Sequence, residues 1–375
     1  MIVDKTNSSD CIRPRRVAVL HVGPGCGQRG GVASVMQELR AMDGQFACEG
    51  IEFAFFETRG FRRVSAIPRF LVQDIPRFVP ASYRADIVHL HVSARGSFYR
   101  KLIFYAIAKL MRRQTVFHLH AGDFDQFSAC ADRVTKMATR WFVGRSDAAI
   151  GVSASCAHVL NRFRGNAHDA RVIGNTAGAA EHDALNAAEA ICRSRPYIAF
   201  AGRLTKQKGV DTLVDALAIL ATRGFDVDLE LAGEGDIQYW RAYAAARGVA
   251  DRLRFAGWLD GADKALFYRD ASIFCLPSQF ESFGIVALEA MFHGIPVVAT
   301  RVGGLPDIVV DGTTGRLVAS SNPIALADAL QELLNDRERG KLMGAAGRQR
   351  AYRLYSADAI ATEYVNCYDE IMRGA

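Results

Sequence analysis

The sequence predicts an α/β protein built from two doubly wound domains that face each other across a cleft. Three observations support this fold class. Short apolar runs, typical of buried parallel strands, alternate with helical periodicity in both halves of the chain. Glycine-rich turns follow several of these runs, where a strand would pass into a helix. With 375 residues, 50% of them hydrophobic, the chain can also fill two cores.

Composition places the domain boundaries near residues 180 and 355. We expect an N-terminal domain over residues 1–180, a C-terminal domain over residues 181–355 and a final helix over residues 356–375. The linker is predicted within residues 177–195, which are rich in alanine and polar residues. Ser356 is a suitable N-cap for the final helix.

Cysteine usage and hydropathy predict a cytoplasmic protein. The eight cysteines are scattered without paired short spacings, so neither a disulfide framework nor a zinc site is indicated. Residues 1–16 are polar and lack the apolar core of a signal peptide. The most apolar window, residues 102–111, is too short to span a bilayer. We therefore expect a reducing compartment and no transmembrane helix.

Positive charge is concentrated in the first half of the chain. Residues 1–186 hold 25 Lys and Arg against 16 Asp and Glu, whereas the remainder holds 21 against 24. Residues 59–84 interleave apolar side chains with one acid, Asp74, and with six arginines: Arg59, Arg62, Arg63, Arg69, Arg77 and Arg84. This pattern is typical of a segment that lies on anionic headgroups, with Arg62 and Arg63 among its contacts. An arginine-rich, solvated loop pair explains it equally well, and without a recognised motif no nucleic acid is expected.

A glycine-rich loop follows the first predicted strand. Residues 16–22 are apolar enough for a buried strand, and residues 23–31 form a loop that opens a helix at Val32. Glycines at such a turn let the backbone approach a phosphate closely. A dinucleotide-binding dehydrogenase would also have such a loop, but the spacing here is not Gly-x-Gly-x-x-Gly.

Two strand-like runs end in histidine. Residues 86–91 end at His91, and residues 115–120 end at His120. In open parallel sheets, ligands bind near the carboxyl ends of the strands. A histidine at a strand end is also often structural, so the pattern alone does not decide its role. The segment after the first run, residues 93–101, is expected to be a loop that offers hydroxyls and cations to an acceptor, with Ser97 and Arg100 as its candidates.

The second half contains a basic turn and two carboxylates. Arg203 follows a strand, and Lys208 and Gly209 open the next helix, an arrangement suited to a diphosphate. Further along, Glu281 lies in the loop before a helix that starts near Gly284, where backbone N–H groups lack partners. Glu289 lies beside the apolar stripe of that helix, so it needs hydrogen-bond donors, and sugar hydroxyls are suitable ones. An exposed basic loop and a capped surface helix are the simpler explanations.

Residues 279–291, together with Gly-Arg-Leu-x-x-x-Lys-Gly at residues 202–209, resemble the retaining, nucleotide-sugar-dependent glycosyltransferases of family 4 (glycosyl transferases group 1), of the exopolysaccharide or cell-envelope type. The resemblance covers nearly the whole chain. It implies the GT-B fold, in which two Rossmann-like domains face a cleft and the last helix packs back onto the first domain. One departure is Gly174-Asn175-Thr176, where the family usually has Pro-Asn-Gly.

The resemblance also implies roles for individual residues. The donor-binding set would be Gly30, Gly31, Arg203, Lys208, Ser282, Phe283, Gly284 and Glu289, with Glu289 on the nucleotide ribose. Glu281 would hold the hexose hydroxyls and support an oxocarbenium-like state. His120 would reach the transferred sugar, with His118 as the alternative.

The implied reaction moves a hexose from a nucleotide diphosphate sugar, GDP-mannose or a UDP-hexose, to a hydroxyl of a lipid-linked or oligosaccharide acceptor. We expect no cofactor and no metal, because the sequence shows no evident set of metal carboxylates. The basic segment suggests peripheral attachment to the inner face of the cytoplasmic membrane. Three rivals are a sugar-nucleotide 2-epimerase of the same fold, a glycogen-type phosphorylase with a pyridoxal lysine, and a non-catalytic module that binds nucleotide sugar.

Overall fold

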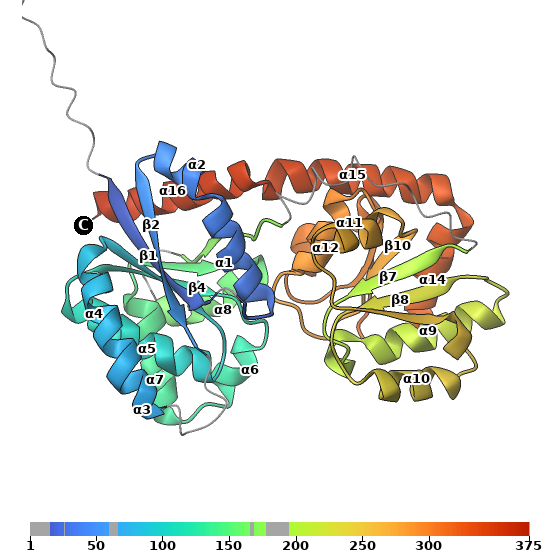
Figure 1. Ribbon diagram of the computed structural model, residues 1–375, viewed down its shortest axis with the longest axis horizontal. Helices are drawn as coiled ribbons and strands as arrows, with labels where there is room; N and C mark the ends of the chain where they lie inside the picture. Colours follow the sequence, from blue (N-terminus) through green and yellow to red (C-terminus); the bar gives the residue numbers. More distant parts are fainter. Residues whose placement is uncertain (1–15, 26, 60–66, 166–168, 178–194, 375) are drawn as a thin grey trace, which may run out of the picture.

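A computed structural model describes residues 16–25, 27–59, 67–165, 169–177 and 195–374. It shows two lobes, each a sheet covered by helices, with two long C-terminal helices lying along one side of both (Figure 1). Each lobe contains one six-stranded sheet, and all described strand pairs are parallel. The predicted fold class, two doubly wound α/β domains, is confirmed.

The N-terminal sheet has the strand order β2-β1-β3-β4-β5-β6. Its strands are β1 (Val17–Pro24), β2 (Ile51–Thr58), β3 (Ile87–Val92), β4 (Gln114–Leu119), β5 (Ala148–Gly151) and β6 (Arg171–Val172). The helices of this lobe are α1 (Gly31–Ala41), α2 (Asp43–Cys48), α3 (Ile67–Arg69), the π-helix η2 (Phe70–Asp74), α4 (Ile75–Arg84), α5 (Gly96–Leu110), α6 (Phe124–Ala129), α7 (Arg133–Arg145) and α8 (Ala154–Arg164).

The C-terminal sheet has the strand order β12-β11-β10-β7-β8-β9. Its strands are β7 (Tyr197–Ala201), β8 (Asp228–Ala232), β9 (Leu253–Gly257), β10 (Ile273–Leu276), β11 (Val297–Thr300) and β12 (Gly315–Val318). Its helices are η4 (Lys206–Lys208), α9 (Val210–Thr222), α10 (Ile237–Ala245), η5 (Ala250–Arg252), α11 (Gly261–Arg269), α12 (Ile285–Phe292), α13 (Leu305–Ile308), α14 (Pro323–Asn335) and α15 (Arg337–Tyr355).

Each sheet has one point where the chain reverses its direction of winding. In the first sheet this point lies between β1 and β3, and in the second between β7 and β10. Loops that leave two such neighbouring strands diverge to opposite faces, which opens a crevice at the carboxyl edge of the sheet. The topology therefore predicts that the loops after β1, β3, β7 and β10 form the binding sites.

The last helix, α16 (Ala357–Arg373), lies against the N-terminal lobe, whereas α15 lies along the C-terminal lobe (Figure 1). Ser356 caps α16 by accepting a hydrogen bond from the backbone N–H of Ala359. The buried face of α16 includes Ile360, Tyr364 and Tyr368. The Tyr368 hydroxyl lies 2.8 Å from Nδ1 of His89 on β3, so this helix ties the end of the chain to the first sheet.

Two segments differ from the sequence-based expectation. The predicted loop over residues 93–101 is a turn only as far as Arg95, because α5 begins at Gly96. Its apolar face, with Phe98, Tyr105 and Ala108 fully buried, favours the helix. The described part of the basic segment, residues 67–84, is helical rather than a loop pair.

Among the described residues, no helix is both long and apolar enough to cross a bilayer.

Candidate active site between the domains

The loop after β10 places Glu281 beside Lys208. The Lys208 Nζ donates to Oε2 of Glu281 at 2.7 Å, although the two residues are 73 positions apart. Both side chains are largely buried, with 21% of Lys208 and 12% of Glu281 exposed. The Glu281 carbonyl also accepts a hydrogen bond from the backbone N–H of Gly304. The structure thus brings together the two residues that the sequence assigned to phosphate and sugar.

Two helices point uncapped N-termini towards this loop. Helix α9 begins after Gly209 and α12 after Gly284; both glycines have positive φ, and neither N-terminus has a side-chain cap. A side chain at Gly209 would overlap the carbonyl of Pro277, which explains the need for glycine there. Unpaired N–H groups at the start of α12 can attract an anion, whereas at α9 the N–H of Val210 donates to the Thr205 carbonyl and the N–H of Thr212 to Oδ1 of Asp211. Arg203, which is exposed after the end of β7, adds a fixed positive charge on the same side of the sheet.

Glu289 is buried in α12 and already has two partners within the protein. Lys264 Nζ donates to its Oε1 at 2.7 Å, and the Tyr268 hydroxyl donates to its Oε2 at 2.7 Å. Sequence reasoning expected hydrogen-bond donors for this carboxylate but did not identify these two. Helical spacing gives a signal in retrospect, since Lys264 and Tyr268 are four residues apart on α11.

The N-terminal lobe contributes the turn after β4. His120 follows the last residue of β4 and is 8% exposed, whereas His118 is completely buried. Two residues later, a Cβ on Gly122 would lie 3.0 Å from the backbone nitrogen of Ser282. The His120 turn therefore touches the Glu281 loop of the other domain. Of the two predicted histidines, this geometry favours His120.

Behind His120 lies an array of five buried histidines from three strands: His21, His89, His91, His118 and His120. Strand register places them together, with His21 beside His89 and His91 beside His118. His91 Nδ1 lies 2.9 Å from His120 Nε2, and His21 Nδ1 lies 3.0 Å from His91 Nε2.

Burial keeps these rings neutral. It lowers the pKa of His21 and of His120 to about 3, with a further lowering at His120 from the charge of Lys101. The pKa values of His89, His91 and His118 are also lowered by burial and by their histidine neighbours. Because Nε2 of His120 faces His91, its Nδ1 is the nitrogen left for a substrate.

The described residues include two groups of three histidines whose ligand nitrogens lie within 4.8 Å of one another, His21-His89-His91 and His91-His118-His120. Neither group includes a carboxylate. The chain also has an Asp-x-Asp after β4 that the sequence-based reading passed over, Asp123-Phe124-Asp125. Its carboxylates have cationic neighbours, since Asp125 pairs with Arg162 and Asp123 lies 3.9 Å from Arg95.

The glycine loop after β1 reaches the same junction. Gly30, with φ of 134°, precedes α1, and this N-terminus also lacks a side-chain cap. A Cβ on Gly31 would lie 3.8 Å from Cδ1 of Ile285, the first residue of α12. Arg29 pairs with Glu234 after β8, and its guanidinium lies 4.8 Å from the ring centroid of Trp258. The loop thus spans from the first domain to the turns that follow β8 and β9.

A cavity of about 170 Å³ lies beside this junction in the N-terminal lobe, between the glycine loop, the end of β3 and the start of α5. Its lining includes Ser97 and Arg100, the two residues predicted to face an acceptor. It also includes Lys101, which sequence reasoning did not single out. The sequence could have indicated Lys101, because it lies on the same helical face as the buried Phe98, Tyr105 and Ala108. Lysine is rarely found on a buried face.

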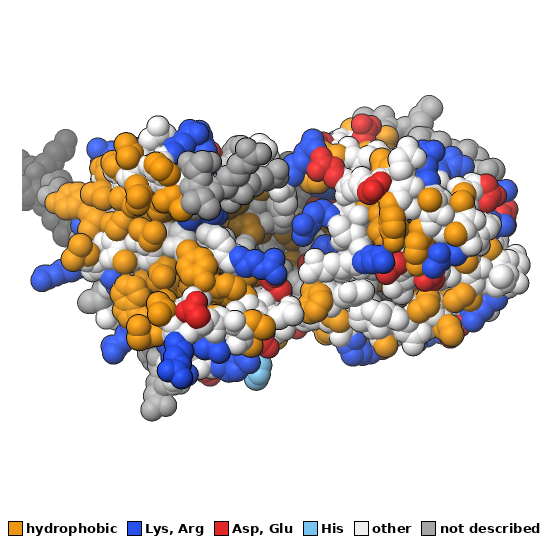
Figure 2. Space-filling model, turned by 90° about the horizontal axis from the view of Figure 1, so that it is seen from below, with side chains coloured by type: hydrophobic (Ala, Val, Ile, Leu, Met, Phe, Trp, Pro, Cys, Tyr) orange, Lys and Arg blue, Asp and Glu red, His pale blue; other side chains and the backbone are white. Residues whose placement is uncertain are grey.

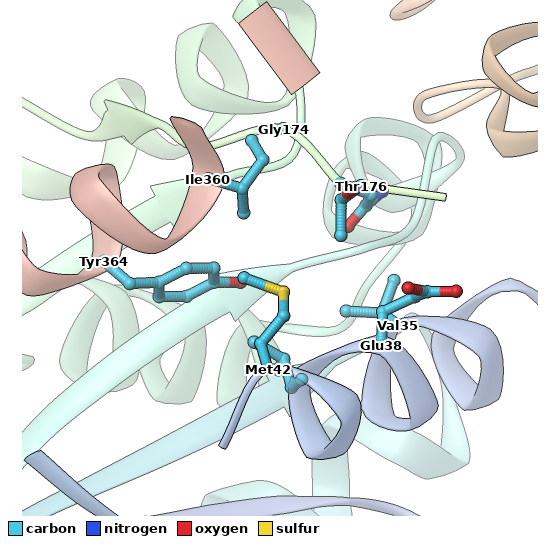
Figure 3. A pocket seen from close by; sticks show the side chains of 9 residues that line it. Val35, Glu38, Met42, Gly174, Thr176, Ile360 and Tyr364 are labelled. Carbon is cyan, nitrogen blue, oxygen red and sulfur yellow. The ribbon is translucent and has the colours of Figure 1, made fainter. Parts of the chain in front are cut away.

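Other predicted residues have different surroundings. Phe283 is 2% exposed and packs against Tyr355, so only its backbone faces the loop. The atypical segment Gly174-Asn175-Thr176 lines a second cavity with α1 and with Tyr364 of α16, shown in Figure 3. That cavity measures about 10 Å³, roughly the space of one water molecule, and cannot hold a sugar. Arg62 and Arg63 lie outside the described residues.

Comparison with known proteins follows the same division into two domains. Residues 13–176 match the family model of the glycosyl transferase 4-like domain, and residues 182–350 match that of the glycosyl transferases group 1. The chain is 30% identical over 301 residues to a glycogen synthase of Mycobacterium tuberculosis, a match covering 78% of this chain and 70% of the relative. A D-inositol 3-phosphate glycosyltransferase of Corynebacterium diphtheriae is 35% identical over 196 residues, which span 48% of this chain and 46% of the relative. The chain thus spans less than half the length of that relative.

Solved structures share the fold at lower identity. Sucrose-phosphate synthase from Thermosynechococcus elongatus superposes with a TM-score of 0.74 at 23% identity over 96% of this chain and all of that one. HepE from Anabaena, in complex with UDP and glucose, superposes with a TM-score of 0.70 at 19% identity over 94% of this chain and all of that one. Two facing doubly wound domains of this kind define the GT-B class of glycosyltransferases. Within that class, the chain belongs to the glycosyl transferases group 1.

Proposed function

We propose that this protein transfers a hexose, with retention of configuration, from a UDP- or GDP-sugar to a hydroxyl of a lipid-linked or oligosaccharide acceptor. The observation that carries the proposal is the Lys208–Glu281 pair at the N-terminus of α12, in contact with the His120 turn of the other domain. One site then holds a cation for phosphate, a carboxylate for sugar hydroxyls and a neutral histidine.

The donor diphosphate binds Lys208, Arg203 and the uncapped N-terminus of α12. These groups balance the charge that develops on the leaving diphosphate. The inferred leaving-group stabilisation needs neither a metal nor a cofactor. In the free protein, Lys208 pairs with Glu281. This ion pair offsets the free-energy cost of burying the Glu281 carboxylate until the diphosphate binds.

Binding of the diphosphate redirects Lys208 towards phosphate and leaves Glu281 to accept hydrogen bonds from hexose hydroxyls. His120, held by His91 through Nε2, presents Nδ1 to the sugar near its reactive carbon. Lys264 and Tyr268 hold the Glu289 carboxylate oriented for the ribose hydroxyls. Retention of configuration is inferred from the resemblance to the family. The classes of donor and acceptor are inferred from the same resemblance.

The test is a panel of UDP- and GDP-sugars incubated with the purified full chain, with release of UDP or GDP measured. We expect slow hydrolysis of one donor, abolished by Lys208→Ala and left within about twofold by Lys206→Ala, which removes an exposed lysine from the same turn. Hydrolysis at the wild-type rate in Lys208→Ala contradicts the site. Epimerised sugar nucleotide formed without acceptor indicates the epimerase, and binding without turnover indicates a non-catalytic module.

We further propose that the acceptor is met at an anionic membrane surface. Helices η2 and α4 expose four apolar side chains, Leu71, Val72, Val79 and Tyr83. The exposed Arg69, Arg77 and Arg84 lie along the same segment. Figure 2 shows hydrophobic side chains gathered over the N-terminal lobe. Apolar side chains rimmed by arginine are typical of a surface that inserts among headgroups.

Co-sedimentation with anionic vesicles at low salt tests this surface. We expect binding that Leu71→Ser with Val72→Ser weakens strongly, and that charge reversal of Arg62 and Arg63 also weakens. Leu342→Ser, which removes an exposed leucine from the C-terminal lobe, should have no effect. Wild-type sedimentation in the first two variants would exclude this attachment.

A further inference from the structure

The cavity at the switch point of the N-terminal sheet is lined by a buried lysine, Lys101, that has no carboxylate partner among the described residues. Lys101 is 2% exposed and donates one hydrogen bond, to the Thr58 hydroxyl at 2.8 Å. Thr58 in turn donates to the carbonyl of Gly23 at the end of β1. No ion pair between Lys101 and a carboxylate is present among the described residues. A buried ammonium with two unused donors is costly unless an anion completes it.

Arg100 adds a second cation to the same cavity. Its side chain is 9% exposed, and it acts on Lys101 only to disfavour the charge there. Asp74 compensates Arg100 in part, since this carboxylate favours the charged guanidinium. Burial, with Arg100, lowers the pKa of Lys101 to about 7, and no carboxylate counters the lowering. The cavity is thus lined by two basic side chains, Arg100 and Lys101.

The remaining lining matches a small polyatomic anion. Ser93 and Ser97 offer hydroxyls, and the loop after β1 closes the other wall through Pro24 and Gln28. A volume of about 170 Å³ exceeds by roughly tenfold the space needed by one water, so a phosphoryl group with part of its substituent fits. The cavity lies at the β1/β3 switch point, where doubly wound sheets bind ligands.

His91 connects this cavity to the proposed reaction site. It lines the cavity, and its Nδ1 lies 2.9 Å from Nε2 of His120, while its Nε2 lies 3.0 Å from Nδ1 of His21. A group held by Lys101 is thus one imidazole ring away from the histidine that faces the transferred sugar. That position lies on the acceptor side of the junction, opposite Lys208.

We propose that this cavity binds a phosphoryl group of the acceptor, held by Lys101 and Arg100. The proposal rests on the proposed glycosyl transfer and adds the chemistry of the acceptor: the hydroxyl that receives the hexose belongs to a phosphorylated molecule. A phosphomonoester carries close to two negative charges at neutral pH, which suits two adjacent cations. The phosphoryl group belongs either to a lipid headgroup or to a water-soluble sugar or polyol phosphate.

The test uses glycerol phosphate and glycerol as probes, titrated calorimetrically into the full chain at constant ionic strength. We expect glycerol phosphate to bind and glycerol not to bind. Lys101→Met should weaken glycerol phosphate binding at least about tenfold, the effect of losing a charge-assisted hydrogen bond. Lys136→Met, which removes an exposed lysine on α7, should leave it within about twofold.

Lys101→Met keeps the length of the side chain and removes the cost of burying a charge, so its Tm should equal or exceed that of the wild type. Arg100→Gln provides a second variant if Lys101→Met does not fold. Equal binding of glycerol phosphate by wild type and both variants overturns the proposal.

Titration with UDP and GDP separates this proposal from the proposed function. Wild-type and Lys101→Met proteins should bind the nucleotide equally. A parallel loss of nucleotide binding in Lys101→Met would assign the cavity to the donor and overturn the inference, while glycosyl transfer would stand. Failure of every nucleotide and nucleotide sugar to bind the wild type would instead remove the proposed function. Vesicles of phosphatidylcholine with and without phosphatidic acid identify the source: binding lost in Lys101→Met supports a lipid phosphate, and unchanged vesicle binding supports a soluble one.

Discussion

The two sides of the interdomain junction handle buried charge in different ways. On the C-terminal side, Glu281 is paired with Lys208 and Glu289 with Lys264, both at 2.7 Å. On the N-terminal side, the histidines are neutral, and Lys101 has only a hydroxyl partner among the described residues. The carboxylates of the C-terminal side therefore have lysine partners within the protein, and the proposed anion site lies on the N-terminal side, where Lys101 has a hydroxyl partner.

Helix ends show a related contrast. Helices α1, α9 and α12, which begin at the junction, start after glycine and have no side-chain cap. Helices α10, α14 and α16 are capped by Asp236, Asn322 and Ser356. A side-chain cap typically stabilises a helix by about 1 kcal/mol. Helices α5 and α11 also lack a side-chain cap, so the missing caps do not by themselves distinguish the junction.

The largest expected effect is on stability in acid, and it separates the two lobes. The array histidines have folded pKa values below the unfolded value of 6.5, near 3 for His21 and His120. Stability is therefore complete above about pH 6.5 and falls as the pH drops towards the folded pKa values. Each such histidine costs about 1.4 kcal/mol per pH unit within that window.

We expect the N-terminal lobe to unfold first when the pH is lowered from about 7 to about 5. The chain has three tryptophans, Trp141 in the N-terminal lobe and Trp240 and Trp258 in the C-terminal lobe. Fluorescence of a variant that keeps only Trp141, compared with one that lacks only Trp141, reports the two lobes separately. One common transition near pH 3 would show that the histidine array does not set the acid limit.

The next largest effect is expected on the C-terminal side. Glu281→Gln keeps the shape of the side chain but removes the charge that supports the transition state. Loss of one electrostatic group of this kind costs about 3–4 kcal/mol, a fall in kcat of roughly a hundredfold to a thousandfold. Steady-state release of UDP or GDP measures it, with Glu338→Gln at an exposed position as the control. A kcat within about twofold of the wild type would show that the charge of Glu281 does not stabilise the transition state.

A smaller effect is expected where the two lobes touch. Gly122→Val inserts a side chain against the Glu281–Ser282 backbone, where even a Cβ would lie only 3.0 Å from Ser282 N. Displacing the His120 turn by about 1 Å should lower kcat by up to roughly a hundredfold while leaving nucleotide binding nearly unchanged. Gly44→Val, at a position with open space around it, is the matched control. Equal kcat in both variants would mean that this contact does not position the reacting groups.

The smallest effect is expected at Glu289. Lys264→Met leaves its carboxylate with Tyr268 alone and weakens its orientation towards the ribose. We expect the KM for the donor to rise by about tenfold with kcat little changed, since ribose contacts contribute equally before and in the transition state. A KM at the wild-type value would show that Tyr268 alone suffices.

Much of this arrangement could be predicted from the sequence. The alternation of strands and helices predicted the fold class, and the Gly-Arg-Leu and Phe-Glu-Ser-Phe-Gly motifs predicted Lys208 and Glu281 as site residues, whose side chains lie 2.7 Å apart in the structure. The chain ends in helix α16, which spans Ala357–Arg373 after Ser356.

The rest depends on register and on contacts between distant segments. Alternation shows that His89 and His91 share a face, but only strand pairing shows that His21 and His118 join them. The approach of Gly122 to Ser282 likewise depends on how two separately folded domains meet. Local periodicity carries no information about that placement.

Nucleotide titration of two lysine variants tests the central contrast most directly. Calorimetry with UDP and GDP, applied to the wild type, Lys208→Met and Lys101→Met, compares a cation on each side of the junction. We predict that the nucleotide that binds the wild type binds Lys208→Met at least about tenfold more weakly and binds Lys101→Met with unchanged Kd. Unchanged binding in Lys208→Met, with loss in Lys101→Met, would contradict the assignment of the donor to the C-terminal side.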